Sequence, residues 1–375
     1  MENKIKYPNY DRSILSISSS ILKKFHVNSD YPSLVELDKY MEQDYKNIIV
    51  MILDCMGTDI VQQNLPEEGI FRKNLKANIT TVFPSTTVAA TTAFHAGTSA
   101  WENGWIGWMP YFKEYNRIIE IFTSKDFYTR EKLEIPNIGE NILQYDTIYS
   151  KIVKENSNVK YHKIFPKFET NGAKTIEEFC RKIECACKTE NEINLICAYW
   201  DEPDHTIHHN GVYAEKTKEI LGEIEAKIEK LTEKLDNTLL VISADHGAVN
   251  VEEIYINDYP ELEECLLIPP SIEARFVTFF IKEDKKVLFK EKFKEVFQDE
   301  FLLFTKEEFL MTHLLGKGKE HYKIKEYLGD FIAISKSNKS IRYTKTASRF
   351  PKLIADHAGL TKAEMEVPVI IIDKK

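Results

Sequence analysis

The sequence predicts an α/β fold in which a mostly parallel sheet is flanked by helices and carries an inserted, smaller cap region. Continuous apolar runs recur along the chain, as in strands that are buried on both faces. Amphipathic helical patterns lie between these runs, which is typical of parallel sheets. Residues 256–330 are denser in charged and aromatic residues and lack ligand-like motifs, so we assign them to the cap. Residues 1–255 and 331–375 would form the catalytic core.

The composition is typical of a soluble globular protein and excludes several function classes. The 375 residues are 43% hydrophobic and carry a net charge of −9. Lysines in 281–297 alternate with acidic residues, which indicates a solvated helix face and no nucleic-acid polymer as partner. The N-terminal segment lacks a signal-peptide core, and no run is long enough to span a membrane. The six cysteines show no disulfide-framework spacing, so we expect a cytoplasmic protein without membrane partners.

Three of the apolar runs lead directly into acidic segments. The runs are residues 47–53, 193–199 and 239–243. The segments that follow them begin with Asp54, with WDEPDHTIHHNG and, after Ala244, with Asp245-His246-Gly247. In open α/β sheets, functional sites form at the carboxyl ends of the strands. A single acidic strand end is usually a turn or a helix cap. Three together, two of them with histidines, predict a metal site, because Asp and His are good zinc ligands.

The second of these acidic segments has the spacing of a helical ligand pair. Pro203 favours a helix start, and Asp204 and His208 are four residues apart, hence on one face of that helix. This is the spacing by which HExxH helices bind zinc. His205 and His209 point elsewhere, so His205 is a candidate for orienting a ligand, contacting substrate or lying on the surface. The alternative is a surface helix with no metal.

Hydroxyl side chains follow a further expected strand, ITTVF at 79–83. Pro84 ends the run, and Ser85, Thr86 and Thr87 precede an alanine-rich helical stretch. Hydroxyls in this position are common helix N-caps. They also lie at the positive end of the helix dipole beside free N–H groups, which favours an alkoxide and a bound oxyanion. The local pattern leaves both roles open.

His357 is the remaining ligand candidate. It lies in a loop of small residues that precedes a short helical pattern and the last expected strand, 367–372. By itself it resembles an ordinary loop histidine, but Asp204 and His208 still need a third ligand. The adjacent Asp356 could orient the imidazole, as carboxylates behind metal-binding histidines do, or could cap the turn.

These motifs, in this order, resemble the alkaline phosphatase superfamily, and most closely its type I phosphodiesterase/nucleotide pyrophosphatase branch. They are Asp54, FPSTT, EPDHTIH, ADHG and HAGLTKAEMEVP, and they extend from about residue 47 to residue 372. The resemblance implies an alkaline-phosphatase-like α/β fold with two divalent metal ions, which we expect to be Zn²⁺, with Mn²⁺ as the alternative. Sulfatases are excluded, because Cys55-Met56-Gly57 does not match their nucleophile motif.

The resemblance also assigns ligands to each ion. One ion would be held by Asp204, His208 and His357. The other would be held by Asp54, Asp245 and His246 together with the nucleophile. Alignment of the hydroxyl segment on the two later glycines, Gly97 and Gly104, places the nucleophile at Thr87.

General chemistry agrees with this assignment. Three protein ligands leave a coordination position open, as catalytic zinc requires. Three aspartates and a threonine alkoxide would carry four negative charges against two divalent ions. Metal coordination lowers the pKa of a hydroxyl enough to make it nucleophilic. The implied mechanism is a double displacement, in which Thr87 attacks phosphorus and water then hydrolyses the phospho-threonine.

The candidate substrate contacts depart from the family pattern. An asparagine that usually follows the second glycine is missing, and Trp108 stands near its place. Asn103 could substitute for it, although a turn role is the alternative. Trp101, Trp105 and Trp108 could form a wall that stacks on a base, or could belong to the core. Lys345 and Arg349 are possible phosphate contacts, with exposed surface charges as the alternative.

We therefore expect a metal-dependent phosphodiester or pyrophosphate hydrolase that acts through a phospho-threonine intermediate on nucleotides or related small diesters. A monoester dianion demands more positive charge near the phosphoryl oxygens, and no arginine immediately follows Thr87. A phosphomonoesterase and a phosphonoacetate hydrolase of the same superfamily remain as alternatives. A catalytically silent, metal-dependent binding protein is a further alternative from another class. The sequence does not determine the oligomeric state.

Overall fold

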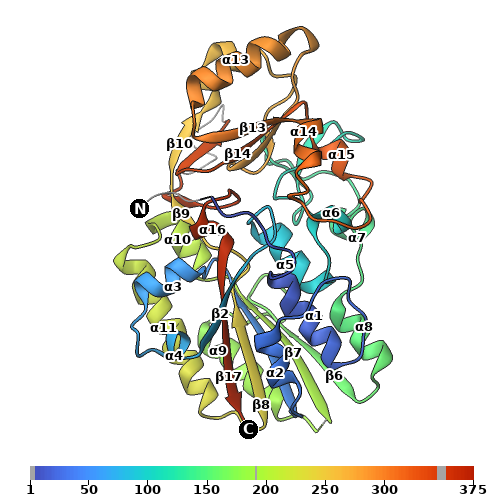
Figure 1. Cartoon of the computed structure of the whole chain (residues 1–375), viewed down its shortest axis with the longest axis vertical. Coiled ribbons are helices and arrows are strands. Elements are labelled where there is room, and N and C mark those ends of the chain that lie inside the picture. Colours follow the sequence, from blue (N-terminus) through green and yellow to red (C-terminus); the bar gives the residue numbers. More distant parts are fainter. Residues whose placement is uncertain (1–4, 191, 344–351) are drawn as a thin grey trace.

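The apolar runs that lead into acidic segments form neighbouring parallel strands in the middle of a six-stranded sheet (Figure 1). The computed structural model describes residues 5–190, 192–343 and 352–375. The sheet order is β2-β17-β8-β1-β7-β6. The strands are β1 (Asn47–Leu53), β2 (Leu75–Thr80), β6 (Val159–Ile164), β7 (Ile193–Trp200), β8 (Thr238–Ser243) and β17 (Glu366–Lys374). Only β17 runs antiparallel to its neighbours, so the mostly parallel sheet expected from the sequence is confirmed.

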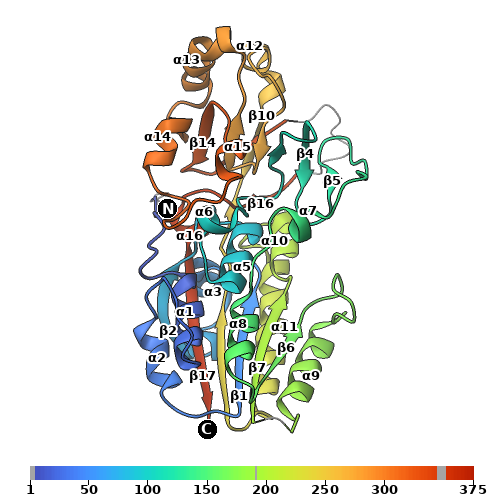
Figure 2. The same cartoon turned by 90° about the vertical axis from the view of Figure 1, so that its right-hand side faces the viewer.

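Two groups of helices lie on opposite sides of this sheet (Figures 1 and 2). One group packs around the first helix and comprises α1 (Ile14–Lys24), α2 (Val35–Met41), α5 (Thr87–Ala96) and α8 (Ile148–Glu155). The other comprises α3 (Thr58–Asn64), α4 (Ile70–Lys73), α9 (Ile176–Cys187), α10 (Asp204–Asn210) and α11 (Glu215–Thr232). Since both faces are covered, every residue of β1 and β8 is buried, which explains their continuous apolar sequence.

A second, antiparallel sheet forms most of the cap at the other end of the molecule (Figure 1). Its order is β11-β12-β14-β13, with β11 (Ser271–Ile272), β12 (Phe276–Phe279), β13 (Phe301–Thr305) and β14 (Phe331–Ser335). The helix α13 (Lys286–Phe297) buries Phe289, Phe293 and Phe297 in a core of the cap's own. Its acids are exposed and its lysines exposed or half-buried, as the alternating charges of 281–297 suggested.

The expected return of the chain to the main sheet at residue 331 is wrong. The run 331–335 is β14, which pairs with β12 and β13 inside the cap sheet. The following strand, β15 (Lys339–Arg342), pairs with β10 (Glu252–Tyr255). An apolar run of five residues indicates that a strand is buried, but it carries no information about which sheet supplies its partners. The cap sheet therefore crosses the boundary expected at residue 330.

Short elements connect these layers. Those between α5 and β6 are α6 (Ala100–Asn103), β3 (Tyr111–Phe112), β4 (Arg117–Glu120), β5 (Lys125–Asp126) and α7 (Ile138–Asn141). Those after β8 are β9 (Val249–Asn250), η1 (Ile256–Asp258), α12 (Pro260–Glu263), η2 (Glu283–Lys285), α14 (Lys306–Met311), α15 (Ile324–Tyr327), β16 (Ala355–Asp356) and α16 (Lys362–Met365). Across the described ranges, none of the helices combines the length and the apolar character that a bilayer crossing needs.

A buried ion pair joins the cap to the core. Arg275, just before β12, donates from Nε and Nη2 to the two carboxylate oxygens of Glu364 in α16, at 2.7 and 2.8 Å. Both side chains are completely buried. Arg275 also donates to the carbonyls of Ser337 and Lys339, and Glu364 accepts the N–H of Gly359. The same carboxylate thus fixes the cap strand and the loop that carries His357.

We expect Arg275→Met to lower the free energy of unfolding by about 3–5 kcal/mol, because it leaves the Glu364 carboxylate buried without its counter-ion. Urea denaturation at constant pH measures this loss. Lys188→Met is the matched control, since it removes an exposed ion pair with Glu184 and should change stability little. Equal losses in the two variants would contradict the anchoring role.

Candidate metal centre

The pairing of the strands brings the acidic segments together at one edge of the main sheet. Leu53 at the end of β1 lies opposite Trp200 of β7, and Ile52 lies opposite Ser243 of β8. The residues that follow these strands therefore start at the same level, below the cap. The convergence of the three strand ends is as the sequence predicts.

The first ligand group contains the three residues expected together. Ligand atoms of Asp204, His208 and His357 all lie within 4.8 Å of one another. Asp204 Oδ1 is 3.3 Å from His208 Nε2 and 3.7 Å from His357 Nε2. Asp204 and His208 occupy one face of α10, and His357 follows β16, which contacts that helix.

The second ligand group lies at the ends of β1 and β8. Ligand atoms of Asp54, Asp245 and His246 lie within 4.8 Å of one another. His246 Nε2 is 3.5 Å from Asp54 Oδ1 and 3.5 Å from Asp245 Oδ2. The two groups adjoin, because the rings of His246 and His357 stack with centroids 3.9 Å apart.

Of the three consecutive hydroxyls, Thr87 faces these groups. Its Oγ1 lies 3.1 Å from His246 Nε2. Thr86 occupies the N-cap position of α5, but its hydroxyl donates to Glu273 Oε1 at 2.9 Å, while Ser85 donates to the Gly359 carbonyl at 2.8 Å. Thr87 is the first residue of α5, so the unbonded N–H groups of the first turn lie beside its hydroxyl.

All three histidines present the same ring nitrogen to the centre. Nδ1 of His208 lies 2.8 Å from the Ala355 carbonyl, that of His246 lies 3.0 Å from the Gly247 carbonyl, and that of His357 lies 3.2 Å from the Ser85 carbonyl. A carbonyl only accepts hydrogen bonds, so each Nδ1 carries the proton. In the neutral ring, Nε2 then offers its lone pair to the centre, which is the arrangement of metal-binding histidines.

The carboxylates have buried oxygens that no hydrogen bond satisfies. They are Asp54 Oδ1, Asp204 Oδ1 and Asp245 Oδ2. Their nearest basic atoms are the imidazole nitrogens at 3.3–3.7 Å. Uncompensated buried carboxylates are costly, and a divalent cation is the species that would satisfy all three oxygens and the lone pairs of the histidines. The residues therefore fit a metal centre.

The ionisation of these groups reflects the crowding of negative charge. Burial, and then the nearby Asp245 and Asp204, raise the pKa of Asp54 well above its usual value. Burial also raises the pKa of Asp245. Burial lowers the pKa of His208, but Asp204 outweighs it and raises that pKa to about 9. Burial and the neighbouring His246 lower the pKa of His357 to about 3. Metal binding would therefore displace protons from the apo centre.

Two glycines allow the loops of the centre to approach closely. A Cβ atom on Gly57, after β1, would lie 2.6 Å from the Cα atom of Gly247. A Cβ atom on Gly247 would lie 2.1 Å from the carbonyl oxygen of Ala363 in α16. The glycine of the ADHG segment is thus required by backbone packing beside the ligands, and a side chain there would displace them.

The tryptophans expected to stack on substrate do not form one wall. Trp105 is buried, donates to the Leu143 carbonyl and packs on Phe122. Trp108 is 36% exposed, and its ring also packs on Phe122. Trp101 donates to the Gly318 carbonyl at 3.2 Å.

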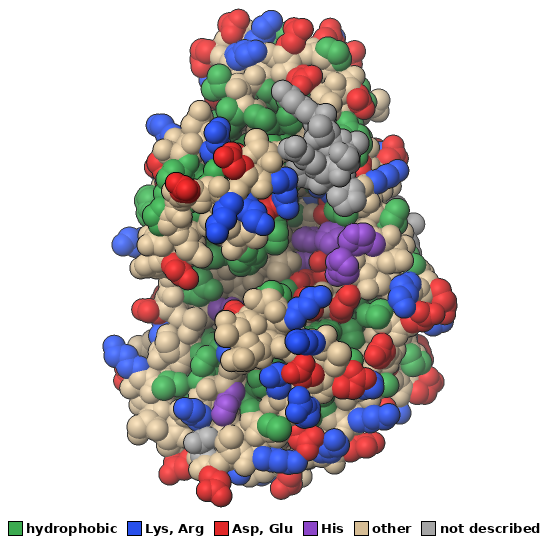
Figure 3. Space-filling view, turned by 180° about the vertical axis from the view of Figure 1, so that it is seen from behind, with side chains coloured by type: hydrophobic (Ala, Val, Ile, Leu, Met, Phe, Trp, Pro, Cys, Tyr) green, Lys and Arg blue, Asp and Glu red, His purple; other side chains and the backbone are tan. Residues whose placement is uncertain are grey.

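The other expected substrate contacts have local partners outside the two ligand groups or lie outside the described residues. Asn103 is buried and holds a turn, since it accepts the N–H of Trp105 and donates to the Thr98 carbonyl. His205 is exposed, with its ring 4.6 Å from that of His209. Exposed histidines gather where the cap meets the core (Figure 3). Lys345 and Arg349 lie outside the described residues.

Three residues at the centre were not found from the sequence. Tyr199 donates its hydroxyl to Asp54 Oδ2, and Cys55 donates its N–H to Asp245 Oδ1 at 3.0 Å. Glu273 comes from the cap and accepts both the Thr86 hydroxyl and the Trp108 N–H. Tyr199 could have been identified from the sequence, because it lies near the carboxyl end of a buried strand. Nothing in the local sequence marks Glu273, because its neighbours at the site come from distant segments.

Glu273→Gln should change the pH dependence of stability. Burial raises the pKa of Glu273 from 4.5 to about 7, so its contribution to stability is full below 4.5 and is lost as pH rises through 7. Glutamine keeps the acceptor oxygen without the charge. We expect the variant to be more stable than the wild type by about 1–2 kcal/mol near pH 8, and equal near pH 4.5, with solvent screening included. Chemical denaturation at both pH values measures this, and parallel pH profiles would contradict it.

Comparisons with known proteins agree with this geometry. The family described as type I phosphodiesterase / nucleotide pyrophosphatase matches residues 48–357. Human ectonucleotide pyrophosphatase/phosphodiesterase family member 5 is 32% identical over 134 residues, which are 31% of this chain and 26% of that protein. The chain thus matches about a quarter of that relative's length.

Solved structures share the fold. Murine ectonucleotide pyrophosphatase/phosphodiesterase 5 superposes with a TM-score of 0.65 at 18% identity and covers 88% of each chain. An inactive threonine-to-alanine variant of that murine protein, in complex with AMP, gives a TM-score of 0.65 at 17% identity and covers 88% of each chain. The human protein gives a TM-score of 0.63 at 18% identity and covers 88% of this chain and 87% of that one. At these identities the likeness shows the fold, including the α/β core expected from the sequence.

Proposed function

The chain belongs to the type I phosphodiesterase/nucleotide pyrophosphatase family, and from this premise we propose that it is a metal-dependent hydrolase of phosphodiester or pyrophosphate bonds in small molecules. The observation that carries the proposal is the placement of Thr87 Oγ1 beside two adjoining three-residue ligand groups. We propose that each group holds one divalent ion, zinc or manganese. The unsatisfied oxygens of Asp54, Asp204 and Asp245 support this occupancy.

The chain's own residues supply the nucleophile and its surroundings. Bound ions would lower the pKa of the Thr87 hydroxyl and neutralise charge on the phosphoryl oxygens. Thr87 Oγ1 attacks phosphorus in line, and the alcohol or nucleotide leaves from the side of Asp204, His208 and His357. First-turn N–H groups of α5 hold the phosphoryl oxygens. Water then hydrolyses the phospho-threonine and restores the hydroxyl.

Aromatic residues between cap and core support a flat leaving group or base as part of the substrate. Tyr128, Tyr255 and Tyr343 line a narrow crevice there, together with Arg342 and Glu273. Glu273 links it to the nucleophile segment through the Thr86 hydroxyl. Aromatic rings offer stacking surface for a nucleobase. A solved relative of the same fold is in complex with AMP, which supports a nucleotide substrate here.

We also propose a reducing, cytoplasmic environment for this protein. All six cysteines are free, and five of them are buried. Their thiols form no disulfide that an oxidising compartment would favour.

A substrate panel tests the proposed reaction. Protein loaded with zinc or manganese is assayed with bis(p-nitrophenyl) phosphate, p-nitrophenyl phosphate, ATP, a dinucleotide and phosphonoacetate in one buffer. We expect a higher kcat/KM for the diester or the nucleotides than for the monoester. A clear preference for the monoester would identify a phosphatase, and faster phosphonoacetate turnover would identify a C–P hydrolase. Stoichiometric metal binding without any turnover would identify a binding protein.

A further inference from the structure

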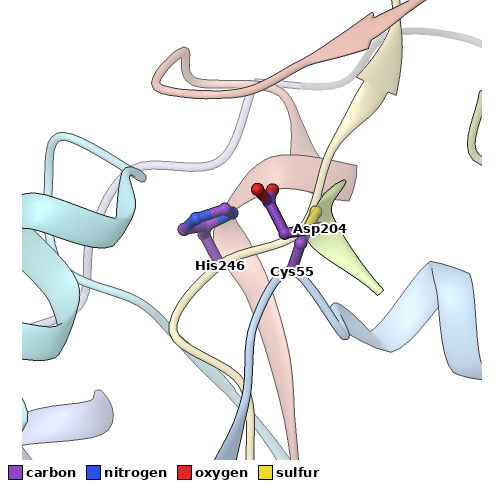
Figure 4. A group of neighbouring side chains, drawn as sticks. All are labelled: Cys55, Asp204 and His246. Atoms are coloured by element: carbon purple, nitrogen blue, oxygen red, sulfur yellow. The ribbon is translucent and has the colours of Figure 1, made fainter. Parts of the chain in front are cut away.

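A cysteine lies among the ligand candidates of the metal centre. Figure 4 shows Cys55, Asp204 and His246 converging from three elements: the end of β1, the start of α10 and the loop after β8. A ligand atom of each lies within 4.8 Å of the other two. Cys55 is completely buried, and its thiol lies against the Asp204 carboxylate.

This cluster overlaps both ligand groups. Asp204 belongs to the first group and His246 to the second, so Cys55 lies where the two meet. Two further carboxylates aim unsatisfied oxygens at the same place. Asp54 Oδ1 and Asp245 Oδ2 are each 3.5 Å from His246 Nε2, and both residues are more than nine-tenths buried. The thiol therefore lies beside buried carboxylate oxygens that no hydrogen bond satisfies.

We propose that Cys55 Sγ, which lies between Asp204 of the first group and His246 of the second, is an additional ligand of one of the two proposed ions when that ion is thiophilic, such as Zn²⁺, Co²⁺ or Cd²⁺. Zinc binds thiolate sulfur at about 2.3 Å and nitrogen or oxygen at about 2.0–2.2 Å. Ligand atoms around one tetrahedral ion are then roughly 3–4 Å apart, so small side-chain rotations close this set. The S–H bond breaks, the proton goes to solvent and the metal–sulfur bond forms, with no change of oxidation state.

A thiolate makes the centre softer than one built from carboxylates and imidazoles alone. Soft ligands favour zinc, cadmium and cobalt over manganese and magnesium. The inference rests on the metal binding proposed above and not on the hydrolytic reaction, so its test reads the metal–sulfur bond directly.

Cobalt spectroscopy and zinc X-ray absorption test the bond. In cobalt-loaded wild-type protein we expect a thiolate-to-cobalt charge-transfer band in the near ultraviolet, and in zinc-loaded protein a sulfur scatterer at about 2.3 Å. Cys55→Gly should lose both signals. Glycine suits this position, because Cys55 has φ of +63°. Cys180→Ser is the matched control, since Cys180 is also buried and free but belongs to α9. It should retain both signals.

The affinities give a second readout. Cys55→Gly should weaken cadmium binding about tenfold or more and change manganese binding much less. Stoichiometric metal without a sulfur signal in the wild type, or a signal that persists in Cys55→Gly, would overturn the ligand role of Cys55 alone. An absence of bound metal in elemental analysis would overturn the proposed metal binding itself, and this inference with it.

Discussion

Replacement of Thr87 by alanine is expected to lower kcat by at least about 10³-fold while the fold and the metal content are retained. The variant removes the oxygen that lies 3.1 Å from His246 Nε2, and no neighbouring hydroxyl can take its place. Thr86 is directed to Glu273 and Ser85 to the Gly359 carbonyl. Steady-state kinetics on the preferred substrate, with elemental analysis of the same samples, measures the effect.

The neighbouring hydroxyls provide the controls. Thr87→Ser should retain part of the activity, because it keeps the oxygen but loses the methyl group that restricts its rotamer. Ser85→Ala and Thr86→Ala should have milder effects, since their hydroxyls bond to groups outside the ligand set. If Thr86→Ala were the inactive variant and Thr87→Ala retained turnover, the nucleophile would be misassigned by one residue.

Asp245→Asn is expected to remove the ion of the second group, about one of two ions per chain, and to reduce turnover to a similar extent as Thr87→Ala. Asp245 Oδ1 accepts the N–H groups of Cys55 and His246, and the asparagine carbonyl can keep both bonds. Oδ2, which faces His246 Nε2, becomes an NH₂ group that cannot bind a cation. Asp245→Asn should therefore weaken metal binding more than it destabilises the fold.

The stability of this variant should change in opposite directions with and without metal. Burial raises the pKa of Asp245, so its ionised form destabilises the apo protein at pH values above that pKa. Without metal, Asp245→Asn should therefore be more stable than the wild type near neutral pH. With zinc the wild type should be the more stable, because binding to the native state adds stability. Thermal unfolding with and without zinc measures this. Asp44→Asn is the charge-matched control at a fully exposed position, and the same response in both variants would contradict the account.

The sequence was most informative for residues whose type suits a metal ligand and whose position follows a buried strand or lies on one face of a helix. Asp54, Asp245 and His246 follow buried strands, and parallel pairing alone brings such strand ends together. The spacing of Asp204 and His208 placed both on one face of α10, as the structure has them. His357, by contrast, depended on the family resemblance, since only the tertiary fold brings its loop to that helix.

The features that the sequence did not predict depend on long-range packing. The run 331–335 was correctly expected to be a buried strand. Its pairing with β12 and β13, however, depends on how the cap folds and not on the apolar pattern of the run itself. The sequence around Trp105 is equally compatible with a core position and with a position that stacks on substrate, and the structure places Trp105 in the core. Glu273 and Cys55 reach the centre through backbone geometry that no short motif encodes.

The most direct test of the account is the identification of the residue that carries the phosphoryl group during turnover. Metal-loaded protein is mixed with a slowly hydrolysed diester, quenched in acid, digested and analysed by mass spectrometry. We predict a peptide in which Thr87 carries the phosphoryl group, and none in Thr87→Ala. A modified Ser85 or Thr86, or full turnover in the wild type with no modified peptide at any quench time, would contradict the account.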